Sequence, residues 1–303
     1  MKKTKGINTL SRILPMNAPE DLKPIFDQLA EKNNFQINDF ARLTGGDIND
    51  VFLIKTLSSE EFVVKLNSSH KFPGMFTAEK MGLEILKRSG NIDIPIVFDV
   101  GEFEGKTYLL LEYKVSAKPT EYFWDLFGKQ LARLHKNTAS KFGLANDNYI
   151  GSLPQQNNFC TTPADFYISE RLEPQLKLAR DKNYNLEITK NFFKNISEII
   201  PQEPPSLIHG DLWNGNYLVN SSGHPCLIDP AMAYAPREMD LAMMKLFGGF
   251  DQQIFQSYQQ EFPLLNGFEE RIPLWQLYYL LVHLNLFGVG YKSAVRDIIR
   301  QFS

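Results

Sequence analysis

The densest group of polar side chains lies in residues 207–216, which read LIHGDLWNGN. Asp211 and Asn216 are five positions apart, and His209 stands two positions before the aspartate. This is the H-x-D-x-x-x-x-N spacing of phosphotransferase catalytic loops, in which the aspartate accepts a proton from a substrate hydroxyl and the asparagine binds a divalent metal. We therefore interpret Asp211 as a candidate general base and Asn216 as a candidate metal ligand.

A second acidic residue follows this loop at a defined interval. Asp229 ends the apolar run CLID, thirteen positions after Asn216, and its position suits the metal-binding aspartate of the kinase D-F-G segment, although Pro230 and Ala231 follow it here. Mg²⁺ prefers oxygen ligands, which Asn216 and Asp229 would supply while phosphates and water complete the shell. In the purely structural alternative, Asp211 and Asn216 form turns and Asp229 is a cap. The interval between the two motifs favours the catalytic interpretation.

Two charged residues in the first third of the chain could meet a nucleotide. In the predicted strand FVVKLN, Lys65 points to the face opposite to the one that carries the strand's larger apolar residues. Glu79 falls on the apolar stripe of a predicted helix, where a carboxylate is costly without a partner. An ion pair between Lys65 and Glu79 would explain both positions. The alternative is an exposed strand lysine and a glutamate at the edge of the helix.

The segment TGGDIND, residues 44–50, is a candidate phosphate-binding loop. Gly45 and Gly46 permit close backbone approach, and free amides can bind phosphate oxygens. The segment matches neither GxxxxGK[ST] nor GxGxxG, so a plain hairpin turn is the alternative.

The elements around these residues change in character near residue 115. A helix is predicted over 20–33, then five strands with one inserted helix over 37–113. From about 118 the apolar spacing is helical, over 120–136, 165–182, 187–200 and from 237 onward, with short strands interrupting it at 206–230. The sequence therefore predicts an α+β fold of two lobes. Residues 1–19 form a loose extension, 20–115 a β-rich lobe and 116–303 an α-rich lobe.

Composition excludes several classes of protein. The chain has 303 residues, of which 43% are hydrophobic, and a net charge of −3, which gives no indication of nucleic-acid or membrane binding. Cys160 and Cys226 suggest neither a metal site nor a disulfide framework, and the basic N-terminus lacks the apolar core of a signal peptide, so we expect a cytoplasmic protein. The most apolar stretch, 272–291, contains Gln276, His283 and Asn285, so we interpret it as a buried helix.

Four stretches together resemble the fructosamine kinase (ketosamine kinase) family, within the aminoglycoside-phosphotransferase-like kinases. They are HGDLWNGN, LIDPAMAYAPREMDLAM, FGLANDNYIGSLPQ and LYYLLVHLNLFG. The resemblance extends from about residue 20 to 300 and implies a protein-kinase-like fold, ATP and Mg²⁺ as cofactors, and a ketosamine substrate, either free or bound to protein.

The resemblance also implies a role for each candidate residue. Asp211 would be the base, and Asn216 and Asp229 would hold Mg²⁺. Residues that would contact ATP are Gly45, Gly46, Lys65 paired with Glu79, and the hinge residues Glu112 and Tyr113. Asp240 and His209 would support the catalytic loop, and Trp213 would either shape the sugar site or only pack.

The implied reaction is phosphorylation of the sugar 3-hydroxyl of a ketosamine, after which the adduct breaks down and the amine is deglycated. Two alternatives are another small-molecule kinase of the same fold, acting on an aminoglycoside, choline or homoserine, and a nucleotide-binding module without turnover. The absence of an acidic carpet near the C-terminus speaks against a polycationic aminoglycoside.

Overall fold

The computed structural model describes residues 22–43 and 48–303. The predicted extension over residues 1–19 and the glycines Gly45 and Gly46 lie outside the described residues. The chain divides into two compact units, which are described separately: Met1–Phe76 with Ile96–Tyr113, and Thr77–Pro95 with Lys114–Ser303. The expected functional boundary at residue 115 remains a prediction.

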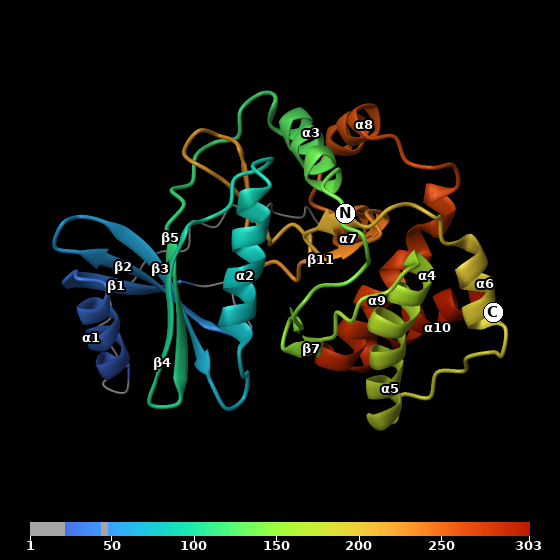
Figure 1. Ribbon diagram of the computed structural model, residues 1–303, viewed down its shortest axis with the longest axis horizontal. Helices are drawn as coiled ribbons and strands as arrows, with labels where there is room; N and C mark the ends of the chain where they lie inside the picture. The colour runs from blue at the N-terminus through green and yellow to red at the C-terminus, as the bar shows by residue number, and fades with distance from the viewer. Residues whose placement is uncertain (1–21, 44–47) are drawn as a thin grey trace, which may run out of the picture. The chain divides into compact units, whose positions relative to one another are not determined.

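The first unit is an antiparallel sheet of five strands in the order β1-β2-β3-β5-β4 (Figure 1). The strands are β1 (Ile37–Leu43), β2 (Asp50–Thr56), β3 (Glu61–Ser68), β4 (Val97–Phe103) and β5 (Lys106–Glu112). Helix α1 (Lys23–Lys32) covers one face, where Phe26 and Leu29 are buried against Phe52 and Val64 of the sheet. Alternate strand residues such as Phe52, Ile54 and Val64 thus form the apolar face that α1 covers, while Leu53 and Leu109 are buried on the opposite face.

The second unit contains most of the helices and three short pairs of strands. Helix α2 (Met75–Arg88) leads into it, with Phe76, Leu83 and Leu86 buried as the helical spacing predicted. Its paired strands are β6 (Asn148–Ile150) with β7 (Leu153–Gln155), β8 (Ser206–Ile208) with β11 (Ala233–Ala235), and β9 (Tyr217–Val219) with β10 (Pro225–Leu227).

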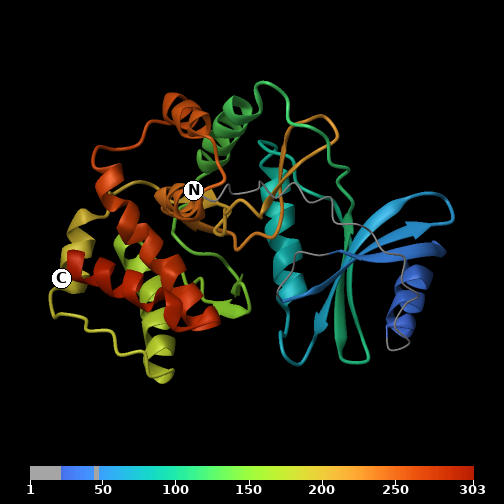
Figure 2. The same cartoon turned by 180° about the vertical axis from the view of Figure 1, so that it is seen from behind.

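Most of the other helices of this unit contribute to a large apolar core. They are α3 (Phe123–His135), α4 (Pro163–Phe166), the π-helix η1 (Tyr167–Leu172), α5 (Glu173–Asp181), α6 (Phe192–Ile199), α7 (Glu238–Phe247), α8 (Gln252–Glu261), α9 (Phe268–Phe287), the 3₁₀-helix η2 (Val289–Tyr291) and α10 (Lys292–Gln301). Helix α9 contacts α5, α7 and α10, and both views place it among them (Figures 1 and 2). Trp275, Tyr278 and Tyr279 of α9 are fully buried in this core.

The predicted fold class is confirmed, with two differences in detail. The five-stranded antiparallel sheet with one inserted helix and the mainly helical second half are both present. Residues 165–182 were expected to form one helix, but the π-turn of η1 separates α4 from α5. The hairpin β6–β7 was not predicted, because strands of three residues are too short to display alternation. Within the described part of the chain, no helix is long and apolar enough to cross a membrane.

Candidate active site

The loop from His209 to Asn216 follows strand β8, and its first two amides bind one buried carboxylate. The Asp240 carboxylate of α7 accepts hydrogen bonds from His209 N at 2.7 Å and Gly210 N at 2.8 Å. Burial alone would raise the pKa of Asp240, but hydrogen bonds from His135 and from the Gly210 amide hold it below its usual value. An ionised Asp240 is therefore a fixed anchor for the start of the loop.

Histidine 135 of α3 supports this anchor from the other side. A carboxylate can only accept, so His135 Nε2 donates to Asp240 Oδ2 at 3.2 Å, and His135 Nδ1 is 2.9 Å from the Tyr258 hydroxyl. All three side chains are buried. Tyr258, His135 and Asp240 thus connect helices α8, α3 and α7 to the loop.

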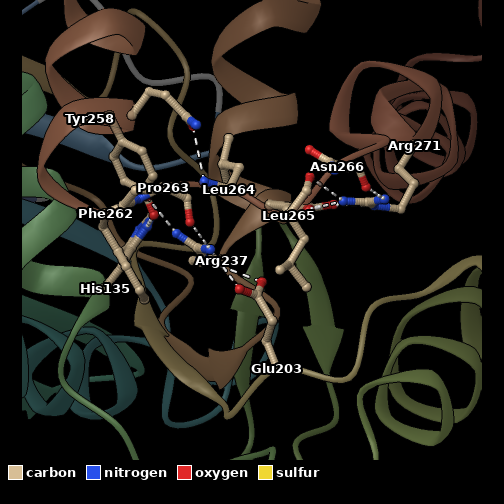
Figure 3. Close-up of polar contacts among 12 residues, drawn as sticks. His135, Glu203, Arg237, Tyr258, Phe262, Pro263, Leu264, Leu265, Asn266 and Arg271 are labelled. Atoms are coloured by element: carbon tan, nitrogen blue, oxygen red, sulfur yellow. Dashed lines mark hydrogen bonds and ion pairs between the residues drawn. The ribbon is translucent and has the colours of Figure 1, made fainter.

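The beginning of α7, which carries Asp240, is held by two ion pairs, and Figure 3 shows the one between Arg237 and Glu203. Buried Arg237 donates two hydrogen bonds to the partly exposed Glu203, at 2.5 and 3.2 Å, and others to the carbonyls of Phe262 and Pro263. The next residue, Glu238, accepts from Arg271 at 2.5 and 2.8 Å and from the Trp275 indole. Because breaking the buried pair between Glu238 and Arg271 would leave an uncompensated charge, these contacts disfavour displacement of α7.

Glycine 210 is required at its position for two reasons. Its φ is +84°, a conformation that L-residues with side chains rarely adopt. A Cβ atom here would also lie 2.1 Å from the Ala231 carbonyl oxygen. The backbone before Asp211 therefore packs directly on the segment that follows Asp229.

The structure brings Asp211, Asn216 and Asp229 together. Asn216 Nδ2 donates to the Asp211 carbonyl at 2.8 Å and to Asp211 Oδ2 at 3.2 Å, and lies 3.5 Å from the Asp229 carbonyl. The Ile228 amide donates to the Asn216 carbonyl at 3.1 Å. Asp229 itself has a φ of +56°, a strained conformation for a residue with a side chain and one that recurs at functional sites.

The buried His209 ring joins the two motifs without facing the reacting centre. Nε2 lies 2.8 Å from the Ile228 carbonyl, which can only accept, and Nδ1 accepts from the Asp211 amide at 3.3 Å. This pattern requires a neutral ring with the proton on Nε2, and burial lowers the pKa of His209 accordingly. The histidine therefore orients the loop and has no free nitrogen for proton transfer.

The Asp211 carboxyl has the most perturbed acidity of this group. Desolvation, reinforced by the nearby Asp229 charge, raises its pKa from 3.8 to about 7, despite the opposing hydrogen bond from Asn216. General bases work best with a pKa near the working pH. A half-buried carboxylate with a pKa of about 7 suits proton abstraction from a hydroxyl group.

The donor set of the site fits Mg²⁺ better than a transition metal. No group of three His, Cys, Asp or Glu residues that could hold a metal occurs among residues 22–43 and 48–303. The hydrogen bonds of the Asn216 side chain all use Nδ2, so Oδ1 can serve as a ligand for a cation, with the Asp229 carboxylate as a second candidate ligand. One carboxylate and one amide oxygen, completed by phosphates and water, is the kind of site that Mg²⁺ uses in phosphotransferases.

Trp213 is a large aromatic side chain held at the surface of the loop. It is 40% exposed, and its ring lies over Gly215, where a Cβ atom would come within 2.4 Å of the indole. An exposed aromatic face two residues after Asp211 can stack on a sugar ring.

The other predicted ATP-binding residues lie outside the segment from His209 to Asp229, and each is described within its own unit. Lys65 lies in the first unit and is only 5% exposed, so the exposed-lysine alternative is wrong. Glu79 lies in the second unit and is half-buried. Glu112 accepts from the Ile96 amide at 2.9 Å, and Tyr113 follows it at the end of the first unit. Their contacts with a nucleotide remain predictions.

Sequence reasoning missed two sets of residues around the loop. His135 and Tyr258 are far from the loop in sequence and show only helical apolar spacing. The stretch FGLANDNYIGSLPQ and the residues after it contain Asn148, Gln155 and Asn157. Their position beside the catalytic loop follows only from the structure, in which Asn148 and Gln155 donate to the carbonyls of Met232 and Ala231, and Asn157 donates to Asn148. Buried carboxamides in a short hairpin give no signal that periodicity can detect.

Comparisons with known proteins identify the family of the chain. The family described as fructosamine kinase matches residues 23–303. A "Probable ketoamine kinase" of Enterococcus faecium is 39% identical over 266 residues, covering 86% of this chain and 94% of that protein. The chloroplastic protein-ribulosamine 3-kinase of Arabidopsis thaliana is 34% identical over 282 residues, covering 90% and 85%. The crystal structure of a "Putative fructosamine-3-kinase" of Haemophilus somnus 129PT has a TM-score of 0.82 at 28% identity, covering 92% and 96%.

Proposed function

The chain belongs to the fructosamine kinase family, and from this premise we propose that it transfers the γ-phosphoryl group of ATP to the sugar 3-hydroxyl of ketosamines. It is an ATP-dependent phosphotransferase with an alcohol group as acceptor. The proposed substrates are ribulosyl- and fructosyl-lysine adducts, with the smaller ribulosyl adduct preferred. Phosphorylation makes the adduct break down, so the outcome is deglycation.

The observation that carries this proposal is the arrangement of Asp211 with Asn216 and Asp229. Asp211, with a pKa raised to about 7, accepts the proton of the substrate hydroxyl as the hydroxyl oxygen attacks the phosphorus. Asn216 keeps one Asp211 oxygen in place through its Nδ2 hydrogen bond, so the other oxygen can face the hydroxyl. Removal of the base is expected to lower kcat by about 10²-fold or more.

Asn216 Oδ1 and the Asp229 carboxylate are proposed to hold Mg²⁺. When bound, the ion neutralises phosphate charge and orients the transferred group. Lys65, in the first unit, is proposed to contact the α and β phosphates. Glu79, in the second unit, is proposed to be its orienting partner. Gly45 and Gly46 would cover the phosphates, and Glu112 and Tyr113 would receive adenine on backbone groups.

The choice of a neutral sugar over a polycation rests on the residues near the base. A neutral sugar needs a few polar contacts and an aromatic face, which the 40% exposed Trp213 offers, whereas a polycation needs a lining of carboxylates. Asp211 and Asp229 are the acidic side chains of the catalytic group, and both already have proposed roles.

A screen of ADP release over ribulosyl-lysine, fructosyl-lysine, kanamycin and choline tests the substrate class. We expect turnover with the two ketosamines, lost in Asp211→Asn. Turnover with kanamycin or choline alone would assign the same catalytic group to a different substrate. No turnover with any alcohol, together with retained ATP binding, would point to a module without catalysis.

A further inference from the structure

Three buried carboxamides form a hydrogen-bonded group between the β6–β7 hairpin and the segment after Asp229. Asn148, Gln155 and Asn157 are all buried. Asn148 Oδ1 accepts from Gln155 Nε2 at 2.7 Å and from Asn157 Nδ2 at 3.0 Å. We call these three residues the carboxamide group. Because unsatisfied buried amides are costly, the orientation of each one must follow from its partners.

Two partners with a single hydrogen-bonding role fix the directions within the carboxamide group. The Arg171 guanidinium can only donate, and its Nη2 donates to Asn157 Oδ1 at 2.7 Å, so Asn157 Nδ2 must face Asn148. The Ala231 carbonyl can only accept, so the Gln155 nitrogen that lies 3.2 Å from it is Nε2, which also faces Asn148, and Gln155 Oε1 accepts from the Tyr278 hydroxyl. With its oxygen occupied twice, Asn148 has only its Nδ2 left to donate.

The hydrogen bonds end on two backbone carbonyls beside the catalytic residues. Asn148 Nδ2 donates to the Met232 carbonyl at 2.8 Å, and Gln155 Nε2 donates to the Ala231 carbonyl at 3.2 Å. Ala231 is two residues after Asp229, and its carbonyl lies against Gly210, next to Asp211. The carboxamide group therefore holds the backbone just after the strained Asp229 and sets how that backbone packs on the catalytic loop.

Burial of the Arg171 guanidinium carries a large desolvation cost. Arg171 is 2% exposed, and its other hydrogen bonds go to the neutral carbonyls of Gln156, at 2.7 Å, and Glu170, at 3.0 Å. Its guanidinium lies 4.5 Å from the centroid of the Phe166 ring. Among the described residues it forms no ion pair, although the Glu170 and Asp147 carboxylates lie near enough to favour its charge, and burial lowers its pKa. Replacing buried charges by apolar residues of similar volume is often neutral or stabilising, so stability alone does not account for this arginine.

The local backbone gives a second indication. Arg171 lies in the π-helix η1, and π-turns inside helices are often found at functional sites. The extra residue of this turn gives the side chain a direction that an uninterrupted α-helix from α4 to α5 would not give it. The sequence RLEP continues at once into α5, so the irregularity is confined to the segment that carries Arg171.

We propose that Arg171 is a positioning residue that acts through the carboxamide group to hold Asp229 in its metal-binding conformation. The inference rests on the proposed function, because that function makes Asp229 a metal ligand. Hydrogen-bond partners of metal ligands typically account for 10- to 100-fold in metal affinity or activity. The carboxamide group acts one step further away, through the backbone of Ala231 and Met232, so we expect an effect at the lower end of that range. Arg171 and the carboxamide group touch neither substrate nor nucleotide in this account.

The substitution Asn157→Asp separates positioning from general stability. It gives Arg171 a carboxylate partner, but it replaces the Nδ2 donor that faces Asn148 Oδ1 and the Asn146 carbonyl by an oxygen that can only accept. Gln156→Glu is the matched control, since it adds the same charge one residue away on an exposed side chain. Mn²⁺ binding to the full-length proteins in the presence of ADP, followed by electron paramagnetic resonance, reports the metal site without turnover.

We expect Asn157→Asp to weaken Mn²⁺ binding about 10-fold or more and to raise the Mg²⁺ concentration needed for half-maximal activity by a similar factor. Metal binding is compared between folded proteins, well below the melting temperature of each, and Gln156→Glu should match the wild type in every measurement. A folded Asn157→Asp protein with wild-type Mn²⁺ affinity and Mg²⁺ dependence overturns the inference. Should Asn157→Asp not fold, Tyr278→Phe decides in the same way, because it removes only the donor to Gln155.

Asp229→Ala distinguishes failure of this inference from failure of the proposed function. Loss of Mn²⁺ binding in Asp229→Ala combined with wild-type binding in Asn157→Asp overturns the positioning role alone. Wild-type Mn²⁺ binding in Asp229→Ala overturns the metal assignment and the positioning role together. The inference is supported if both variants bind Mn²⁺ more weakly than the wild type and the loss is larger in Asp229→Ala.

Discussion

Replacing the base by its amide is expected to make the metal-free protein more stable. The fold raises the pKa of Asp211 from 3.8 to about 7, mainly through desolvation and then through the Asp229 charge. An ionised Asp211 therefore destabilises the folded state at neutral pH. Asp211→Asn keeps the shape and can still accept the hydrogen bond from Asn216 Nδ2, but it carries no charge.

The size of the effect follows from the pKa difference. About 3 pH units at about 1.36 kcal/mol each give roughly 4 kcal/mol. Because the Asp211 side chain is half-buried and solvent screens part of its charge, we expect about half of this, roughly 2 kcal/mol. For a chain of this size that corresponds to an increase in melting temperature of about 4 °C.

The sign depends on pH in a defined way. Below pH 3.8 the carboxyl is protonated in both the folded and the unfolded state, so it costs nothing. Between pH 3.8 and about 7 the unfolded state loses the proton first, so the folded state becomes progressively less stable as pH rises. Above about pH 7 the full cost is present. The advantage of Asp211→Asn should thus be roughly 1 kcal/mol at pH 5.5 and roughly 2 kcal/mol at pH 8.

Thermal unfolding in EDTA at these two pH values measures the prediction, and EDTA removes any cation that would neutralise Asp229. Asp297→Asn is the control, because that carboxylate is exposed on α10 and should give no gain that grows with pH. An Asp211→Asn protein no more stable than the wild type at pH 8, or a gain of equal size at both pH values, would refute the reasoning about desolvation.

Further predictions concern the metal, the nucleotide and the sugar. Asp229→Ala should abolish Mg²⁺-dependent turnover and Asn216→Ala should raise the Mg²⁺ requirement; unchanged Mg²⁺ titrations in both would remove the metal assignment. Lys65→Met should raise the KM for ATP, lower kcat, or both, with a milder effect of Glu79→Gln; unaltered ATP kinetics in Lys65→Met would exclude a phosphate contact. Trp213→Ala should raise the KM for the ketosamine more than the KM for ATP, and equal changes in the two constants would argue for plain packing.

Local patterns in the sequence were sufficient for the sheet and for the grouping of the catalytic loop. The alternate residues Phe62, Val64 and Leu66 of FVVKLN share the core face with α1, although Lys65 on the opposite face is buried as well. The helical stripe of Phe76, Leu83 and Leu86 is buried as predicted. The grouping of Asp211 with Asn216 also depends on local spacing, because the loop between β8 and β9 is short.

Features that depend on contacts distant in sequence could not be predicted in this way. Arg171 occurs in a stretch with helical spacing, and nothing in that stretch indicates that the guanidinium turns inward to Asn157 rather than to solvent. The hydrogen bonds from Asn148 to Met232 and from His135 to Asp240 join residues 84 and 105 positions apart. Apolar periodicity describes which face of an element is buried, but not which polar groups satisfy one another inside the core.

The central claim is that Asp211 directs phosphoryl transfer to the 3-hydroxyl of a ketosamine. Phosphorus NMR of the products formed from ATP with ribulosyl-lysine, fructosyl-lysine and kanamycin tests it most directly. We expect a phosphate ester at carbon 3 of the ketosamine sugar, formed faster from the ribulosyl adduct and absent with Asp211→Asn. Phosphate on kanamycin and on neither ketosamine would contradict the proposed ketosamine kinase activity.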